Sequence, residues 1–211
     1  MSSVAIDGGR FITFEGGEGA GKSTQIAALA EHLRSQGYTV RTTREPGGTE
    51  LGEAVRGVLM GEYEAPMPAM SELLLIFAAR AAHLLQVIEP ALDNGEIVLC
   101  DRFTDASFAY QGVARGLGEP AVATLERLVQ GERRPDGVLV LDLPVEQGLA
   151  RARSRGEDNR FDHEAVAFHT VVRETYQMRA RANPERYALI DAAGSSQQVS
   201  RAVIAAAHVW L

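Results

Sequence analysis

The sequence predicts an α/β fold in which five parallel strands carry helices on both faces of the sheet. Short runs rich in β-branched and aromatic residues alternate with segments of helical spacing, which is the rhythm of βαβ units. A glycine-rich stretch after the first such run has the spacing of a phosphate-binding loop. The chain of 211 residues has no repeat, low-complexity tract or linker, so we expect one domain over residues 1–211.

The first strand, 11–15, leads directly into the candidate phosphate-binding loop. The pattern Gly, four residues, Gly-Lys-Ser/Thr is met by Gly16, Gly17, Glu18, Gly19, Ala20, Gly21, Lys22, Ser23 and Thr24. Glycines let successive N–H groups point at phosphate oxygens at the positive end of the next helix. Lys22, the only lysine in the sequence, is expected to reach the phosphates, and Ser23 to bind Mg²⁺. The alternative is a flexible glycine loop that binds nothing.

The next elements place a second candidate loop beside the first. Apolar residues at helical spacing predict a helix over 23–35, followed by a strand over 38–43. A Pro-Gly-Gly turn begins beyond the carboxyl end of this strand, where open α/β sheets hold ligands. Arg44 and Pro46 are therefore candidate substrate contacts, although Arg44 could equally be a solvated loop charge. Thr49 is expected to cap the helix that follows.

A long helix is predicted from Ser71 to about Glu89, because Pro90 would end it. Phe77 and Arg80 share a face of this helix, since they are three residues apart. An aromatic ring beside an arginine could stack on a base and hydrogen-bond its edge. The competing interpretation is a core phenylalanine and a surface arginine.

An apolar run over 97–102 ends in an acidic and a basic residue and is typical of a buried parallel strand. Asp101 is a candidate to hold Mg²⁺, directly or through water, beside the phosphate loop. Arg102 is a candidate to bind an acceptor phosphate. A structural ion pair at a strand end is the alternative. The helical stretch that follows should bring three polar residues to the same crevice: Ser107, Tyr110 and Gln111.

The remaining elements complete the sheet and add an arginine-rich segment. We expect helices over 120–129, 144–155, 163–183 and 196–211, and strands over 138–143 and 187–191. Four arginines lie within ten residues around Gly156: Arg151, Arg153, Arg155 and Arg160. This segment, about 151–162, is interpreted as a lid that closes over phosphates. The alternative is an ordinary solvated helix end.

Composition limits the partners that this chain can have. The formal charge of −7 argues against a broad nucleic-acid surface, which needs excess positive charge. Cys100 is the single cysteine, which excludes an internal disulfide and suits a reducing compartment. We find no apolar leader and no apolar run of 18 residues. The sequence therefore indicates a cytoplasmic protein with no membrane or nucleic-acid partner.

Four separated motifs together resemble bacterial thymidylate kinases, which have a P-loop NTPase fold. The motifs are the phosphate-binding loop, Arg44-Glu45-Pro46-Gly47-Gly48, Asp101-Arg102-Phe103 with Ala109-Tyr110-Gln111-Gly112, and the Arg-rich lid. The resemblance runs from about residue 10 to residue 211. It implies a nucleoside monophosphate kinase that phosphorylates dTMP to dTDP with ATP and Mg²⁺, in dTTP biosynthesis. It also implies a homodimer, formed through helices around 71–89 and 101–111.

The resemblance assigns a role to each candidate residue. Lys22, Glu18 and Arg102 would be catalytic, with Glu18 near the acceptor sugar and Arg102 on the dTMP phosphate. Arg80 and Ser107 would hydrogen-bond the thymine edge, and Tyr110 would pack beneath the deoxyribose. One position departs from the family pattern. The stacking aromatic commonly lies four residues before the base-reading arginine, where this chain has Ile76, so we expect Phe77 to stack instead.

The resemblance also indicates where the catalytic arginine lies. Some family members carry an arginine directly after the loop carboxylate, but this chain has Gly19 there. The lid is therefore expected to supply it, with Arg155 the first candidate, Arg153 the second and Arg160 a contact to ATP.

Two other function classes remain open at this point. One is a kinase for another nucleotide or small acceptor. The other is a nucleotide-switched GTPase or a regulatory ATP-binding module. A guanine-reading Asn-Lys-x-Asp sequence is impossible here, because Lys22 is the only lysine. A regulatory module would not need Arg80, Arg102 and the lid arginines together.

Overall fold

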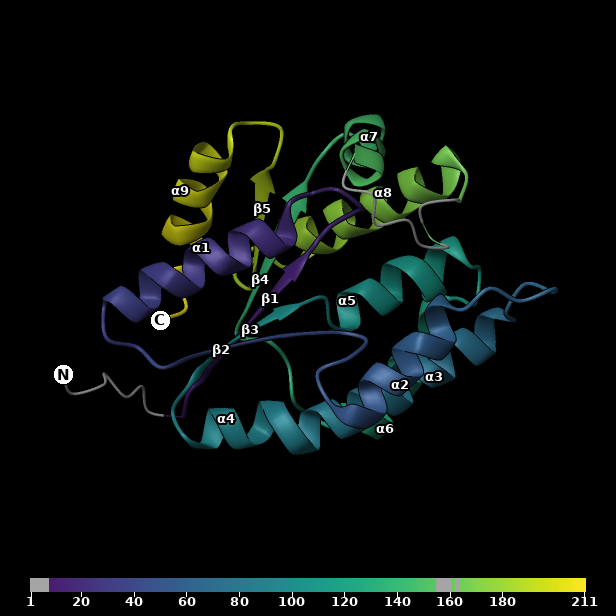
Figure 1. Cartoon of the computed structure of the whole chain (residues 1–211), viewed down its shortest axis with the longest axis horizontal. Coiled ribbons are helices and arrows are strands. Elements are labelled where there is room, and N and C mark those ends of the chain that lie inside the picture. The colour runs from purple at the N-terminus through teal and green to yellow at the C-terminus, as the bar shows by residue number, and fades with distance from the viewer. Residues whose placement is uncertain (1–7, 155–160, 162–163) are drawn as a thin grey trace.

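The structure is a computed structural model that describes residues 8–154, 161 and 164–211. A five-stranded sheet forms its centre, with strand order β2-β3-β1-β4-β5 and every neighbouring pair parallel (Figure 1). The strands are β1 Arg10–Glu15, β2 Val40–Arg44, β3 Ile97–Asp101, β4 Gly137–Asp142 and β5 Tyr187–Asp191. The predicted parallel sheet is confirmed.

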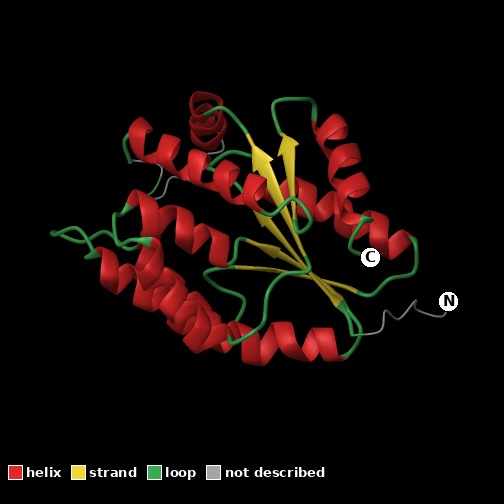
Figure 2. Cartoon of the chain, turned by 180° about the vertical axis from the view of Figure 1, so that it is seen from behind, coloured by secondary structure: helices red, strands yellow, loops and turns green. Residues whose placement is uncertain are grey.

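Helices cover both faces of the sheet (Figure 2). They are α1 Lys22–Ser35, α2 Glu50–Met60, α3 Ala69–His83, α4 Glu89–Asp93, α5 Thr104–Ser107, α6 Glu119–Gln130, α7 Val145–Ser154, α8 Val166–Ala182 and α9 Ser196–Ala207, with π-helical segments η1 Leu84–Ile88 and η2 Phe108–Ala114. Alternating residues of the central strand explain the two layers. Ile12 and Phe14 pack in one core with α1 and α9, whereas Phe11 packs with η1 and α4 on the opposite face.

The long helix of the sequence prediction begins earlier and ends later than expected. It starts at Ala69 and continues through η1 and α4 to Asp93, so Pro90 does not end it. The reason is the π-helical turn, in which the Glu89 N–H donates to the Leu84 carbonyl. This wider turn changes the hydrogen-bond pattern just before Pro90, which has no N–H to donate, so the helix continues past the proline.

This continuous helix meets a length and composition test for a membrane span, although charged and polar residues interrupt its apolar positions, so no uninterrupted apolar run of 18 residues occurs. Ala69–Asp93 has 25 residues and an apolar window of mean hydropathy 1.5, which suffices by length and composition alone. Half of that window is buried in the fold, and Glu72, Arg80 and His83 are buried with it. We interpret the segment as a core helix of the domain.

Other predicted boundaries shift by a few residues. The second strand covers 40–44 and not 38–43, the third ends at Asp101, and the last helix ends at Ala207. The helical stretch predicted after Arg102 extends through η2 to Ala114. The predicted cap at Thr49 is confirmed, since its side chain accepts a hydrogen bond from the N–H of Gly52.

The phosphate loop and the start of α7 contact each other backbone to backbone. A Cβ atom on Gly19 would overlap the carbonyl oxygen of Gly148, and one on Gly148 would overlap the carbonyl oxygen of Glu18. Gly19 also has a φ of 69°, in the left-handed region that favours glycine. Two glycines are therefore needed for the loop to lie this close to α7.

Candidate active site

The candidate loop joins β1 to α1 as the motif requires. The Nζ atom of Lys22 donates to the carbonyl oxygens of Gly16 and Gly17, at 3.2 Å each, so the ammonium group lies over the loop. Burial lowers the pKa of Lys22, and the nearby charge of Arg102 lowers it further. A buried cation that is held only by carbonyl oxygens can exchange those contacts for an incoming phosphate.

The two predicted metal-binding residues lie together beside this loop. The Ser23 hydroxyl is 3.4 Å from Oδ2 of Asp101. The other carboxylate oxygen, Oδ1, is buried and has no hydrogen-bond partner among the described residues. A hydroxyl and a carboxylate oxygen suit Mg²⁺, which usually keeps waters and substrate phosphates as its other ligands. No larger cluster of His, Cys, Asp and Glu that could hold a metal occurs in the described part of the chain.

Arg102 leaves the end of β3 in a left-handed backbone conformation, with a φ of 67°. This conformation is uncommon outside glycine and occurs most often at functional sites. The backbone N–H of Arg102 donates to the Phe14 carbonyl, which fixes the turn. The guanidinium group reaches the phosphate loop, where Nη2 lies 2.7 Å from Glu18 and Nη1 lies 3.1 Å from the Gly16 carbonyl oxygen. The turn therefore directs a cation at the loop.

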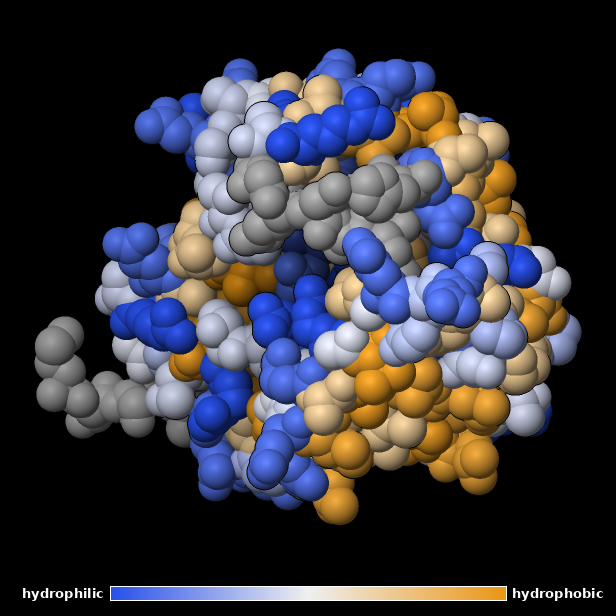
Figure 3. All heavy atoms as spheres, turned by 45° about the vertical axis from the view of Figure 1, so that its right-hand side comes forward, coloured by the Kyte–Doolittle hydropathy of each residue, from blue (hydrophilic) through white to orange (hydrophobic). Residues whose placement is uncertain are grey.

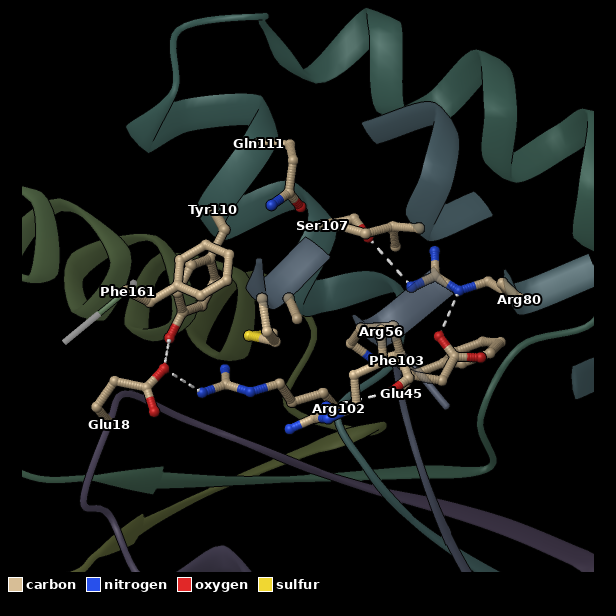
Figure 4. A pocket seen from close by; sticks show the side chains of 14 residues that line it. Glu18, Glu45, Arg56, Arg80, Arg102, Phe103, Ser107, Tyr110, Gln111 and Phe161 are labelled. Atoms are coloured by element: carbon tan, nitrogen blue, oxygen red, sulfur yellow. Dashed lines mark hydrogen bonds and ion pairs between the residues drawn. The ribbon is translucent and has the colours of Figure 1, made fainter. Parts of the chain in front are cut away.

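Glu18 connects the loop to the neighbouring helical segment. One carboxylate oxygen accepts hydrogen bonds from Arg102 and, at 2.9 Å, from the Tyr110 hydroxyl (Figure 4). Burial would raise the pKa of Glu18, but the charges of Arg102 and Lys22 outweigh burial and lower the pKa to about 2. Glu18 is therefore a carboxylate at neutral pH.

A cavity opens between Glu18 and the helices α2, α3, α5 and η2 (Figure 4). Three arginines line it at different points: Arg56, Arg80 and Arg102. The remaining lining residues include predicted substrate contacts and apolar side chains: Pro46, Met60, Ile76, Phe103, Ala106, Ser107, Tyr110, Gln111 and Phe161. Figure 3 shows hydrophilic side chains around a hollow in one face of the molecule.

Arg80 and Gln111 each present one hydrogen-bonding group that is not used within the fold. The Nε atom of Arg80 donates to Glu45 at 2.7 Å, and Nη2 donates to Ser107 at 3.1 Å. Its Nη1 atom is buried and has no partner among the described residues. Gln111 donates its amide nitrogen to Glu72 at 2.6 Å, which leaves its side-chain carbonyl as an acceptor. Both residues line the cavity, Arg80 with donor groups only and Gln111 with a carbonyl that can accept.

Two predicted substrate contacts lie elsewhere. Phe77 does not line the cavity: it is buried in a core with Leu73 and Phe108, and its ring packs against the guanidinium of Arg80. Ile76 lines the cavity in its place. Arg44 is half exposed, pairs with Glu53 at 2.9 Å and faces a separate groove. The prediction that Phe77 stacks on a base is not supported by this geometry.

Arg56 is a cavity residue that the sequence analysis missed. It donates to the carbonyl oxygen of Pro46 at 3.1 Å, so the turn after β2 and helix α2 hold it in place. A signal for it exists in the sequence. Arg56 lies four residues after Gly52 and therefore on the helix face that packs against the Pro-Gly-Gly turn.

A second hollow lies on the other side of the phosphate loop. It is lined by Gly19, Gly21, Thr24, Arg151, Ala192, Ser196 and a few neighbours. Arg151 donates to the Ala192 carbonyl oxygen at 3.2 Å, which ties α7 to the segment after β5. Arg153 is exposed on α7, and the predicted lid residues Arg155 and Arg160 lie outside the described residues.

A family model described as thymidylate kinase matches residues 14–203. The chain belongs to the thymidylate kinase family. Thymidylate kinases of Pseudomonas putida (strain W619) and Pseudomonas syringae pv. syringae (strain B728a) are 58% and 60% identical to it. The matches cover 92% and 88% of this chain and 93% and 88% of the relatives. The crystal structure of thymidylate kinase from Ehrlichia chaffeensis matches with a TM-score of 0.77 at 33% identity, over 94% of this chain and 98% of that chain.

Family membership confirms four predictions from the sequence. These are the resemblance itself, the P-loop NTPase fold, the enzyme class of nucleoside monophosphate kinases, and the phosphorylation of dTMP to dTDP. The two hollows meet at the phosphate loop, since Glu18 lines the first and Gly19 lines the second. The roles of individual residues follow from the chemistry of each hollow.

Proposed function

We propose that the protein transfers the γ-phosphoryl group of ATP to dTMP, giving dTDP for dTTP synthesis, with dTMP in the cavity between Arg102 and Arg80. The observation that carries this proposal is that Arg80 and Gln111 both line the cavity and that Gln111 keeps its side-chain carbonyl as an acceptor. Thymine presents an O4 acceptor and an N3–H donor, which complement this pair, whereas cytosine presents an amino donor at position 4. Membership of the thymidylate kinase family supports the same reaction.

The opposite end of the cavity is suited to the acceptor phosphate. Arg102 and Arg56 both reach it, and a guanidinium group can hold a phosphate with two parallel hydrogen bonds. Tyr110 and Glu18 lie between the two ends and would contact the deoxyribose. In this arrangement the ring of Tyr110 occupies the space beside the sugar and disfavours a 2′-hydroxyl.

The phosphates of ATP are proposed to bind residues 16–24, with the adenosine in the second hollow beside Arg151. Mg²⁺ would be held by Ser23 and Asp101, directly or through water, and would neutralise charge on the phosphates. Lys22 would exchange its carbonyl contacts for phosphate oxygens and stabilise the moving group together with Arg102. Among the lid arginines, Arg155 remains the proposed source of further transition-state charge.

We also propose a cytoplasmic homodimer. Exposed apolar side chains gather on neighbouring elements α3, η1, η2 and α6: Met70, Leu74, Leu85, Val113 and Leu128. Figure 3 shows an apolar surface beside the hydrophilic hollow. The helices named by the family resemblance are among these elements, and a contiguous apolar surface commonly marks an interface.

A panel of nucleoside monophosphates assayed with ATP and Mg²⁺ tests the proposed reaction. We expect dTMP to have the highest kcat/KM, and dCMP to be poor because its amino group would face the guanidinium of Arg80, which can only donate. Faster turnover of AMP, GMP or CMP would assign the cavity to another acceptor. ATP or GTP hydrolysis without transfer to any monophosphate would favour the switch class instead.

A further inference from the structure

Arg80 owes its orientation to a buried carboxylate. Glu45 accepts from Nε of Arg80 at 2.7 Å, and the two side chains are 3% and 1% exposed. The guanidinium carbon also lies 4.5 Å from the ring centre of Phe77 and 4.9 Å from that of Phe103. The rings restrict the guanidinium to this region of the cavity wall, and the hydrogen bonds from Nε to Glu45 and from Nη2 to Ser107 fix its rotation.

The second oxygen of Glu45 is held by a histidine that the proposed reaction does not use. Nδ1 of His83 lies 2.9 Å from Oε1 of Glu45, and the His83 side chain is fully buried. His83 follows Arg80 by three residues on α3, so both side chains project from the same face of the helix and reach one carboxylate. Behind the histidine, Nε2 lies 2.6 Å from the hydroxyl of Thr43 on β2.

The chemistry of these groups fixes the direction of each hydrogen bond. A carboxylate only accepts, so Nδ1 of His83 must carry the hydrogen that faces Glu45. In the neutral ring Nε2 is then an acceptor, which the Thr43 hydroxyl satisfies. The chain therefore runs from Thr43 through His83 to Glu45, where it meets the donor from Arg80. Both oxygens of Glu45 are engaged, and the carboxylate is not free to rotate.

Loss of the histidine bond would release one oxygen of Glu45 inside a buried site. A buried acceptor without a partner turns toward the nearest donor. Nε of Arg80 donates to the other oxygen, so a carboxylate that turns toward a new donor would draw the guanidinium out of its place in the cavity wall.

We propose that His83 is a positioning residue that keeps the guanidinium of Arg80 in its place in the cavity wall, where the base would bind, with Thr43 holding the histidine in turn. The inference rests on the proposed function, because it assumes that Arg80 reads thymine. It makes the selectivity for thymine depend on a side chain that does not touch the substrate. Catalysis at the phosphate end would depend on it much less, since Arg102 and Lys22 are held by separate contacts.

Two substitutions at His83 separate positioning from simple packing. The side-chain nitrogen of asparagine occupies the place of Nδ1, so His83→Asn keeps a donor toward Glu45. The side-chain nitrogen of glutamine occupies the place of Nε2, so His83→Gln keeps only the contact to Thr43. For His83→Gln we expect a loss of roughly 10-fold in dTMP affinity and in the dTMP-to-dCMP ratio of kcat/KM, with kcat at saturating dTMP within about 3-fold of wild type. His83→Asn should retain both properties within about 3-fold.

The measurements are dTMP binding by calorimetry, the two kcat/KM values and the melting temperature of each variant. Equal effects of both variants on selectivity, or changes in melting temperature alone, would overturn the positioning role. A wild-type enzyme without preference for dTMP over dCMP would instead refute the proposed function. If either His83 variant fails to fold, Thr43→Val provides the test: we expect about a 3-fold fall in the same ratio, and an unchanged ratio would reject the inference.

Discussion

Replacement of Glu15 by glutamine is expected to remove most of the pH dependence of stability between pH 5 and pH 8. Glu15 ends β1 and is fully buried. Burial raises its pKa from 4.5 to about 8, and the charge of Asp105 acts in the same direction. Arg102 and hydrogen bonds from Tyr176 and Phe103 act against this rise without cancelling it. The folded protein therefore keeps a proton on Glu15 at neutral pH.

The direction of this pH dependence follows from the number of protons bound by the folded and by the unfolded protein. Between pH 4.5 and about 8 the unfolded chain has released the proton that the folded chain retains, so stability falls as the pH rises and levels off above the folded pKa. The difference between the folded and unfolded pKa values of Glu15 lowers the free energy of unfolding by roughly 5 kcal/mol across the whole pH window and by roughly 3 kcal/mol up to pH 7. Glutamine is neutral throughout. Its carbonyl can accept from the Phe103 N–H, and its amide can donate to the Tyr176 oxygen.

The assay is urea unfolding of both proteins at pH 5, 6, 7 and 8, analysed as the difference between them. Other titrating groups cancel in this difference, and Glu18, with a pKa of about 2, titrates below the window. The Glu15→Gln variant should gain roughly 3 to 5 kcal/mol relative to wild type from pH 5 to pH 8. Parallel stability curves would show that Glu15 is already charged in the folded protein and would refute the reasoning.

Three further predictions concern the reaction. Lys22→Ala should lower kcat/KM by at least ~10²-fold, about 2.7 kcal/mol of transition-state stabilisation, and a folded variant with near wild-type turnover would exclude the phosphate-loop mechanism. Tyr110→Ala should narrow the preference for dTMP over ribothymidine monophosphate, and an unchanged ratio of kcat/KM values would contradict its contact with the sugar. Arg155→Ala should lower kcat by roughly 10²- to 10³-fold with little change in dTMP binding, because a closing lid would act on the transition state. Arg155→Lys should recover only part of the lost kcat, because a lysine cannot reproduce the two-pronged contact of a guanidinium. Silent variants at Arg151, Arg153, Arg155 and Arg160 would remove the lid from the mechanism.

The sequence predicted the sheet and the phosphate loop because their signals are local. The run before Gly16 is apolar and β-branched, the glycine spacing is unusual, and the next helix has regular periodicity. Helix ends were less predictable. Pro90 is a helix-ending residue by itself, and only the preceding π-helical turn, which has no clear sequence pattern, lets the helix continue.

Some cavity residues could be predicted from local sequence and others could not. Arg102 follows directly after a recognisable strand, and Tyr110 and Gln111 lie in the helical stretch that comes next, so all three were predicted. The choice between Ile76 and Phe77 depended on the rotation of α3, which long-range packing of Phe77 against other helices sets. Counting residues along a helix gives a shared face but does not say which neighbour that face meets.

The contact between Gly19 and Gly148 restricts the evolutionary routes open to this enzyme. A chain that gained arginine at position 19 would not simply add a cation to the loop, because a Cβ atom there overlaps the backbone of α7. An arginine in the loop and a helix α7 resting on the loop backbone are therefore alternatives in this fold. A change from one arrangement to the other requires the loop and the start of α7 to move apart, so substitutions at positions 19 and 148 depend on each other.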